Sequence, residues 1–166
     1  MTRGETVTPS SIQSGEWFTY RIRFQNTGNF PATFIAVRDT LDAHLDWSTF
    51  ETLSTSHNVN VSRNSDGSIE WYFPNIMLPC DSVDEAGSHG YIYYRVRPHT
   101  NLQLGEQVQN QAFIYFDYNP AIITNIAITE VALPLGLDEA SRAYNMQAIP
   151  NPTNGFVKLV LSDKTS

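Results

Sequence analysis

The most constraining feature of this sequence is the period-two pattern within Trp17–Phe24, in which every second side chain from Phe18 onward is apolar: Phe18, Tyr20, Ile22 and Phe24. Successive side chains of a β-strand point to opposite faces, so the pattern predicts a strand with one buried face. A second alternating segment runs from Tyr91 to Arg97 and stops at Pro98, which cannot donate a ladder hydrogen bond. Two half-buried strands need a common core, and we expect them to form a sheet around it.

Further strands are predicted between the turn signals, over Thr33–Leu41, Ser48–Ser54, Asn58–Val61, Ile69–Phe73, Val108–Tyr118 and Ile122–Val131. Asp66-Gly67 predicts a hairpin, and Asn119-Pro120 predicts the turn between the last two strands. No window before residue 135 shows sustained helical periodicity. The expected fold class is therefore all-β: an immunoglobulin-like antiparallel β-sandwich of seven or eight strands.

The sequence changes character near residue 133. We expect a sandwich domain over residues 1–132, a linker over 133–147 and a second unit over 148–166. In the second unit, the apolar segment Phe156–Leu161 is predicted to be a strand that finds no partner before the chain ends. A strand without a partner is rarely an autonomous structure, so the second unit is expected to be truncated.

Charge and cysteine usage exclude several classes of protein. The net charge of -7 argues against a nucleic-acid partner, since binding phosphates needs clustered basic residues. No segment is apolar enough to span a membrane, and no apolar signal segment opens the chain, so we expect it to be part of a longer parent protein. Cys80 is alone, which excludes an intrachain disulfide and a cysteine-based zinc site but leaves its redox state open. Lys158 and Lys164 are the only lysines, which excludes a Lys–Asn isopeptide bond within the sandwich domain.

The end of the chain carries a recognisable motif. The segment Ile149–Phe156, with Pro150, Asn151, Pro152 and Gly155, follows a Leu135-Gly136-Leu137-Asp138-Glu139 stretch. It resembles the start of the C-terminal sorting domain of type IX (Por) secretion, although Ile149 stands where that family usually has tyrosine. The resemblance implies export across an outer membrane and the secretion machinery as a partner.

The sandwich domain carries a second resemblance. Its motifs are Tyr20–Gly28, Arg38–Asp42, Asn75–Pro79, Gly87–Gly90 and Ile114–Pro120. They resemble an immunoglobulin-like conserved-repeat module of large exported surface proteins of the Bacteroidetes. The resemblance implies a secreted or outer-surface location, upstream domains of the parent protein as partners, and a role as a spacer before the sorting signal. It assigns no ligand.

Catalytic residues are not predicted. His44, His57, His89 and His99 are scattered without the spacing of a metalloprotease pair. Ser88 and His89 are neighbours, but adjacent residues of a strand point to opposite faces and cannot share a proton. We therefore expect no enzyme activity. We interpret the glycines of the Gly87–Gly90 motif as residues that the backbone needs at a tight entry into the following strand.

Acidic residues suggest a calcium site as an alternative to ordinary turn-forming carboxylates. The candidates come from loops at the strand ends: Asp39, Asp42, Asp81, Asp84 and Asp117. Calcium takes six to eight oxygen ligands, which several loops would have to supply together. Asp117 could instead accept backbone N–H groups at the Asn119-Pro120 corner. We therefore expect no cofactor, with calcium as the alternative.

Outward-facing aromatic residues suggest a glycan site. The candidates are Trp17, Tyr91, Tyr93 and Tyr115, expected near Arg21, Arg23, Arg95 and Arg97. Aromatic rings can stack on sugars, but tyrosine and arginine also form ordinary cross-strand pairs. A coplanar row of rings would favour a sugar platform, and dispersed rings would favour packing.

These observations predict a non-catalytic structural or adhesion-type spacer module of a secreted or cell-surface protein. The alternative is a carbohydrate-binding module that tethers an upstream hydrolase to a polysaccharide.

Overall fold

The computed structural model describes residues 6–133, 145–149 and 158–162. The chain divides into two compact units, residues 1–133 and 134–166. The first unit contains β1 (Thr6–Val7), α1 (Pro9–Gln13), β2 (Phe18–Gln25), β3 (Ile35–Asp39), β4 (Leu45–Thr55), β5 (Asn60–Arg63), β6 (Ile69–Phe73), the 3₁₀ turn η1 (Ala86–Ser88), β7 (His89–Pro98), β8 (Gln107–Asn110), β9 (Ala112–Phe116), β10 (Ile122–Ile123) and β11 (Ala127–Val131). Within the described residues, no helix is both long and apolar enough to cross a membrane.

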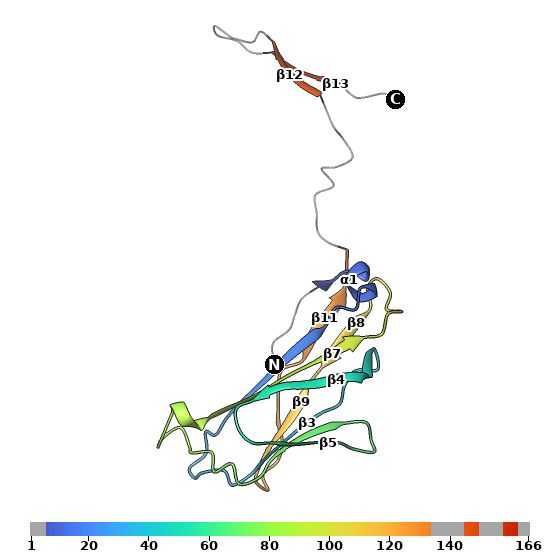
Figure 1. Cartoon of the computed structure of the whole chain (residues 1–166). Coiled ribbons are helices and arrows are strands. Elements are labelled where there is room, and N and C mark those ends of the chain that lie inside the picture. Colours follow the sequence, from blue (N-terminus) through green and yellow to red (C-terminus); the bar gives the residue numbers. More distant parts are fainter. Residues whose placement is uncertain (1–5, 134–144, 150–157, 163–166) are drawn as a thin grey trace. The chain divides into compact units, whose positions relative to one another are not determined.

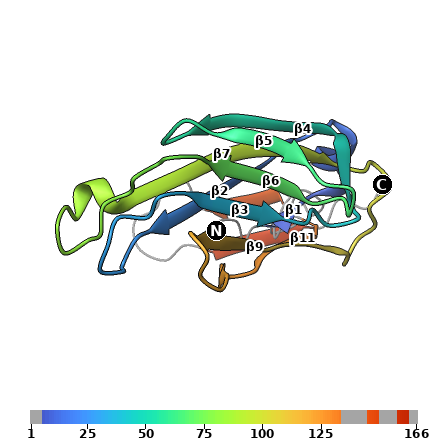
Figure 2. The same ribbon diagram turned by 90° about the horizontal axis from the view of Figure 1, so that it is seen from below.

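The first unit is built from three sheets that enclose one core. A five-stranded sheet has the order β10-β9-β3-β6-β5, and two three-stranded sheets have the orders β2-β7-β4 and β1-β11-β8. All described strand pairs of this unit are antiparallel except β1 with β11. Figure 1 shows the strands running between two ends of the unit, and Figure 2 shows β9, β3 and β6 in front of β2 and β7. The predicted all-β, immunoglobulin-like antiparallel sandwich is confirmed.

The residues of the period-two pattern form the predicted half-buried strand, β2. β2 pairs with β7 along its whole length, from Phe18 opposite Val96 to Gln25 opposite His89. Phe18, Tyr20 and Ile22 are fully buried, and the residues between them face outward. Packing of β2 and β7 against the five-stranded sheet removes their apolar faces from water, which is the main force that stabilises such a sandwich.

Two predicted strands are each divided between two sheets. Val108–Tyr118 becomes β8 and β9, and Ile122–Val131 becomes β10 and β11. The long hairpin bends near Gln111, where its side-chain amide donates to the Thr124 carbonyl at 2.9 Å and the Thr124 hydroxyl accepts the Ala112 N–H at 3.0 Å. The apolar alternation continues through the bend, so the sequence pattern gives no sign of it.

Other predicted elements differ mainly at their ends. Strand β4 is longer than the predicted Ser48–Ser54, and its pairing with β7 shifts register twice, as β-bulges do. The predicted hairpin is confirmed, because β5 pairs with β6 and Gly67 of its turn has φ +85°. The helix α1 was not predicted, since five residues are too few for a periodic pattern; Thr8 caps it by accepting the Ser11 N–H.

The second unit contains a two-stranded antiparallel sheet, formed by β12 (Asn145–Ile149) and β13 (Lys158–Ser162). The prediction that the last strand lacks a partner is therefore wrong. Its partner precedes it in the chain, within a segment that the sequence placed mostly in the linker. The sorting-motif residues Pro150, Asn151, Pro152 and Gly155 lie outside the described residues.

Candidate functional site

The outer side of β2 and β7 carries exposed and half-buried side chains that contact one another. We call it the β2–β7 face and define it by the outward side chains of these strands and of Trp17: Trp17, Thr19, Arg21, Arg23, Tyr91, Tyr93, Arg95 and Arg97. Strand pairing places Arg95 opposite Thr19, Tyr93 opposite Arg21, and Tyr91 opposite Arg23. Cross-strand partners of this kind interact directly, because their Cβ atoms lie about 4.5–5.5 Å apart.

Aromatic rings on this face are engaged by arginines. The Arg95 and Arg97 guanidinium carbons each lie 4.3 Å from the centre of a Trp17 ring. The Arg21 Nη1 atom donates to the Tyr93 hydroxyl at 2.9 Å, and the Arg21 guanidinium carbon lies 5.6 Å from the Tyr93 ring centre. These contacts fix the direction in which the guanidinium groups point.

Three of the four predicted glycan candidates meet on this face, but they do not form a flat row. The rings of Tyr91 and Tyr93 are inclined by 79° to one another. Tyr115 belongs to β9 in the five-stranded sheet, where the Arg38 guanidinium carbon lies 5.8 Å from its ring centre. The arrangement is that of cation–aromatic cross-strand pairs rather than a coplanar stacking platform.

The charge of the β2–β7 face comes from its four arginines. Arg95 forms an ion pair with Glu51 of β4, with Nη2 and Oε2 2.7 Å apart. Within residues 6–133, Arg21, Arg23 and Arg97 form no ion pair with a carboxylate. The face therefore carries uncompensated positive charge on a chain whose net charge is -7.

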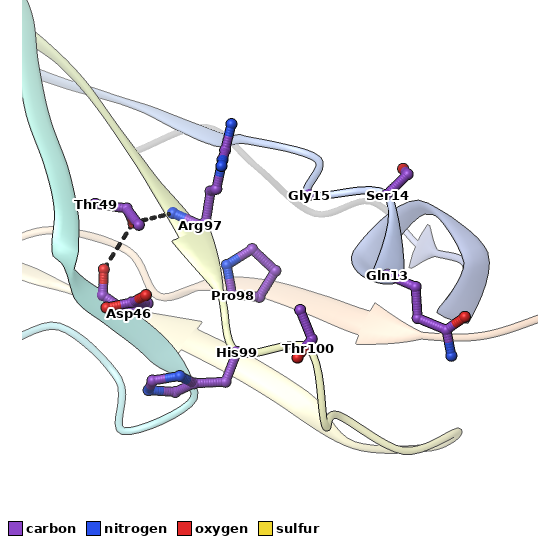
Figure 3. Close-up of a pocket in the computed structure, with 9 residues that line it drawn as sticks. All are labelled: Gln13, Ser14, Gly15, Asp46, Thr49, Arg97, Pro98, His99 and Thr100. Atoms are coloured by element: carbon purple, nitrogen blue, oxygen red, sulfur yellow. Dashed lines mark hydrogen bonds between the residues drawn. The ribbon is translucent and has the colours of Figure 1, made fainter.

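An open pocket adjoins the Arg97 end of this face. Figure 3 shows its lining: Gln13, Ser14, Gly15, Asp46, Thr49, Arg97, Pro98, His99 and Thr100. The Thr49 hydroxyl donates to the Asp46 carbonyl at 2.7 Å and accepts the Arg97 N–H at 2.8 Å. The Arg97 guanidinium points toward Gly15, away from the His99 ring. The pocket offers hydroxyl, amide and guanidinium groups, without a nucleophile bonded to a base.

The five calcium candidates do not gather at one place. Asp39 ends β3 inside the core, whereas Asp117 bonds to the loop that precedes β3, so the two carboxylates lie at opposite ends of that strand. Asp42 accepts N–H groups from Gln109 and His44, and Asp84 accepts the Gly87 N–H at 3.0 Å. Among the residues that the structure describes, no three histidine, cysteine or acidic side chains are placed to hold a metal ion. Asp81 belongs to no such group either.

Asp117 accepts backbone N–H groups, but not from the corner that the sequence suggested. Its Oδ1 atom accepts from Thr33 at 2.8 Å and from Phe34 at 3.0 Å. Asp117 itself has φ +50°, a left-handed conformation that aspartate tolerates better than most residues. The carboxylate thus ties the turn after β9 to the loop before β3.

Ser88 and His89 form no catalytic pair. The Ser88 hydroxyl donates to the Glu85 carbonyl at 2.7 Å, and His89 Nε2 lies 3.0 Å from a Glu85 carboxylate oxygen. Glycine at position 90 is explained by steric exclusion, because a Cβ atom on Gly90 would lie 2.1 Å from a ring carbon of Phe24. Gly90 is therefore needed for close packing at the start of β7.

A buried polar cluster of Asp39, Tyr94 and Asn110 was not predicted. The Tyr94 hydroxyl donates to Asp39 Oδ2 at 2.6 Å, Asn110 Nδ2 donates to the same oxygen at 3.2 Å, and Asn110 Nδ2 also contacts the Tyr94 hydroxyl. Burial raises the pKa of Asp39 to about 7 against the opposing effect of these hydrogen bonds. Burial and the neighbouring Asp39 carboxylate likewise raise the pKa of Tyr94.

The sequence contained a signal for this cluster. Asp39 follows Ile35 and Val37 at every second position, so the alternation already placed its carboxylate on the buried face. Because residues 6–133 contain no lysine, the Asp39–Asn110 pair cannot form an isopeptide bond and is held by hydrogen bonds. The cluster is a structural element of the core, since it has no opening to solvent.

The architecture defines the chain as an immunoglobulin-like β-sandwich module. The family described as "Domain of unknown function (DUF7619)" matches residues 1–130, and the chain belongs to this family. No curated protein matches the sequence.

Solved structures with a similar fold include a bacterial adhesin domain and a bacterial pilin. The N-terminal domain of the Streptococcus gordonii adhesin Sgo0707 is 15% identical over 77% of this chain and 30% of that chain, with a TM-score of 0.54. The full-length major pilin SpaD of Corynebacterium diphtheriae is 15% identical over 69% of this chain and 31% of that chain, with a TM-score of 0.51. At this identity the likeness concerns the fold, and the match spans about a third of each solved chain.

Proposed function

We propose that this chain is a non-catalytic, adhesion-type structural module of a secreted or cell-surface protein. The observation that carries the proposal is the distribution of its polar and charged side chains between the core and the surface. In the described sandwich, Asp39, Tyr94 and Asn110 bond to one another inside the core, whereas an array of cations and aromatic rings lies on the outer side, on the β2–β7 face. The similar folds of an adhesin domain and a pilin support this function.

The proposed route to the surface is type IX secretion, with upstream domains of the parent protein as further partners. The motif that includes Pro150, Asn151, Pro152 and Gly155 supports this route. Replacing the first three of these residues by alanine in the parent protein is expected to keep it inside the outer membrane. Protease accessibility on intact cells measures this, and unchanged surface exposure would count against the route.

The geometry gives less support to the alternative of a carbohydrate-binding module with a flat platform. Arginines lie against Trp17, and the rings of Tyr91 and Tyr93 are steeply inclined, so a sugar ring cannot stack on all three together. A sugar polymer would have to be held mainly by charge and hydrogen bonds.

Retention of protein-coated beads under flow tests the adhesive function. Beads carrying the whole chain are passed over matrix proteins, neutral polysaccharides and acidic polysaccharides, with calcium and with chelator. Saturable retention on at least one surface is expected, and retention on none would contradict the adhesive role. Chromogenic glycosidase, esterase and peptidase substrates are assayed in parallel, where turnover proportional to protein concentration would contradict the non-catalytic role.

A further inference from the structure

We propose that the β2–β7 face binds an acidic polysaccharide. This inference rests on the adhesion-type function proposed above and names the chemical class of its ligand. Three properties of the face carry it: concentrated positive charge, guanidinium groups held in fixed directions, and an extended shape that continues into a polar pocket.

The positive charge is local. The face holds Arg21, Arg23, Arg95 and Arg97, while the chain as a whole carries -7. Two carboxylates lie nearby on β4: Glu51 pairs with Arg95, and Asp46 stands opposite Arg97 in the strand ladder. Four guanidinium groups against these two carboxylates leave an excess of positive charge on the face, which attracts an anionic ligand.

Three of the four guanidinium groups, those of Arg21, Arg95 and Arg97, are held by contacts before a ligand arrives. Arg97 lies against Trp17, and Arg21 is bonded to the Tyr93 hydroxyl. An ordered guanidinium loses less side-chain entropy on binding than a mobile one, and its planar set of N–H groups matches a carboxylate or sulfate. Exposed lysines would not supply this preorganisation, and the face contains none.

The arrangement fits a polymer better than a single small anion. Outward residues along a strand recur about every 6.6–6.8 Å, so the side chains from Tyr91 to Arg97 span about 20 Å. The arginines are spread along this length and only Arg97 of the four lines the pocket described above, so one small anion would contact only some of them. An extended chain with a charge on successive units would contact them in turn.

The pocket beyond Arg97 adds groups that suit a sugar. Gln13, Ser14 and Thr100 line it and offer amide and hydroxyl groups. These groups can hydrogen-bond to the hydroxyls of a sugar at one end of the polymer.

The test measures binding of the whole chain to polygalacturonate and to heparin fragments by calorimetry, with dextran as the neutral control and duplex DNA as a second polyanion. Saturable binding to at least one acidic polysaccharide is expected, and it weakens as salt shortens the range of electrostatic attraction. The double variant Arg23→Gln/Arg97→Gln is expected to bind about tenfold more weakly, or about threefold for each arginine. Both side chains are exposed, and an unchanged melting temperature would verify that the variant folds.

Arg63→Gln is the matched control, because Arg63 is equally exposed and lies against Trp47, but belongs to β5 in the other sheet. Its binding is expected to change less than twofold. No binding to either acidic polysaccharide at about 50 mM salt, an equal loss in Arg63→Gln, or equally tight binding to DNA would each overturn the inference. Retention of coated beads on a matrix protein or neutral polysaccharide would then still support the adhesive function, which separates the two failures.

Discussion

Asp39 makes the stability of the sandwich depend on pH in an unusual direction. The carboxyl group is buried, and its pKa rises from 3.8 to about 7 because burial disfavours the charged form. The folded protein therefore keeps a proton that the unfolded chain releases above pH 3.8. Stability contributed by the neutral acid is fully present below about pH 4 and is lost as pH rises through 7.

The size of the effect follows from the shift. One pKa unit corresponds to about 1.4 kcal/mol, so the full shift is worth about 4 kcal/mol, of which about 3 kcal/mol falls between pH 5 and pH 8. Asp42, Asp46 and Asp66 have lowered pKa values, so their contributions are lost only as pH falls below about 4. These three carboxylates therefore do not contribute to the pH dependence between pH 5 and pH 8.

The prediction is tested by urea unfolding of the wild type and of Asp39→Asn at pH 5, 6, 7 and 8, which gives the free energy of unfolding at each pH. The wild type is expected to lose about 3 kcal/mol more than the variant over the range, since an amide does not titrate. Asp66→Asn, in the exposed β5–β6 turn, is the control and should follow the wild type. Parallel curves for the wild type and Asp39→Asn would refute the assignment of the pH dependence to Asp39.

Three further substitutions test the packing and the hydrogen bonds. Gly90→Ala is expected to lower the free energy of unfolding in urea by about 2–3 kcal/mol, because the new Cβ would overlap the Phe24 ring. The control Gly105→Ala should lower it by about 1 kcal/mol, because of its φ of +87° alone. Equal losses would contradict the steric explanation. Tyr94→Phe should cost about 1–3 kcal/mol by calorimetry, since it removes the buried hydrogen bond that the hydroxyl donates to Asp39, and an unchanged melting temperature would argue against it. Asp117→Ala should lower the melting temperature more than Asp117→Asn, which keeps an acceptor for two N–H groups; identical melting curves would count against that role.

Part of the candidate site could be predicted from the sequence. Alternation placed Arg21, Tyr93 and Arg95 on the outer side of their strands, and the structure brings them together by pairing β2 with β7. Tyr115 looked equivalent, because alternation gives the face of a strand but not the sheet to which it belongs. Strand β9 joins the other sheet, so Tyr115 lies apart from the β2–β7 face.

The sequence by itself determined the fold class, because apolar side chains at every second position can be buried only by strands that share a core. It also placed Asp39 on a buried face. Only the tertiary structure decided that Tyr94 and Asn110 meet this carboxylate, that the long hairpin bends at Gln111, and that β12 pairs with β13. The first depends on contacts between segments far apart in the sequence, the second on a bend that leaves alternation intact, and the third on a pairing between neighbouring strands, and periodicity within one strand carries no information about any of them.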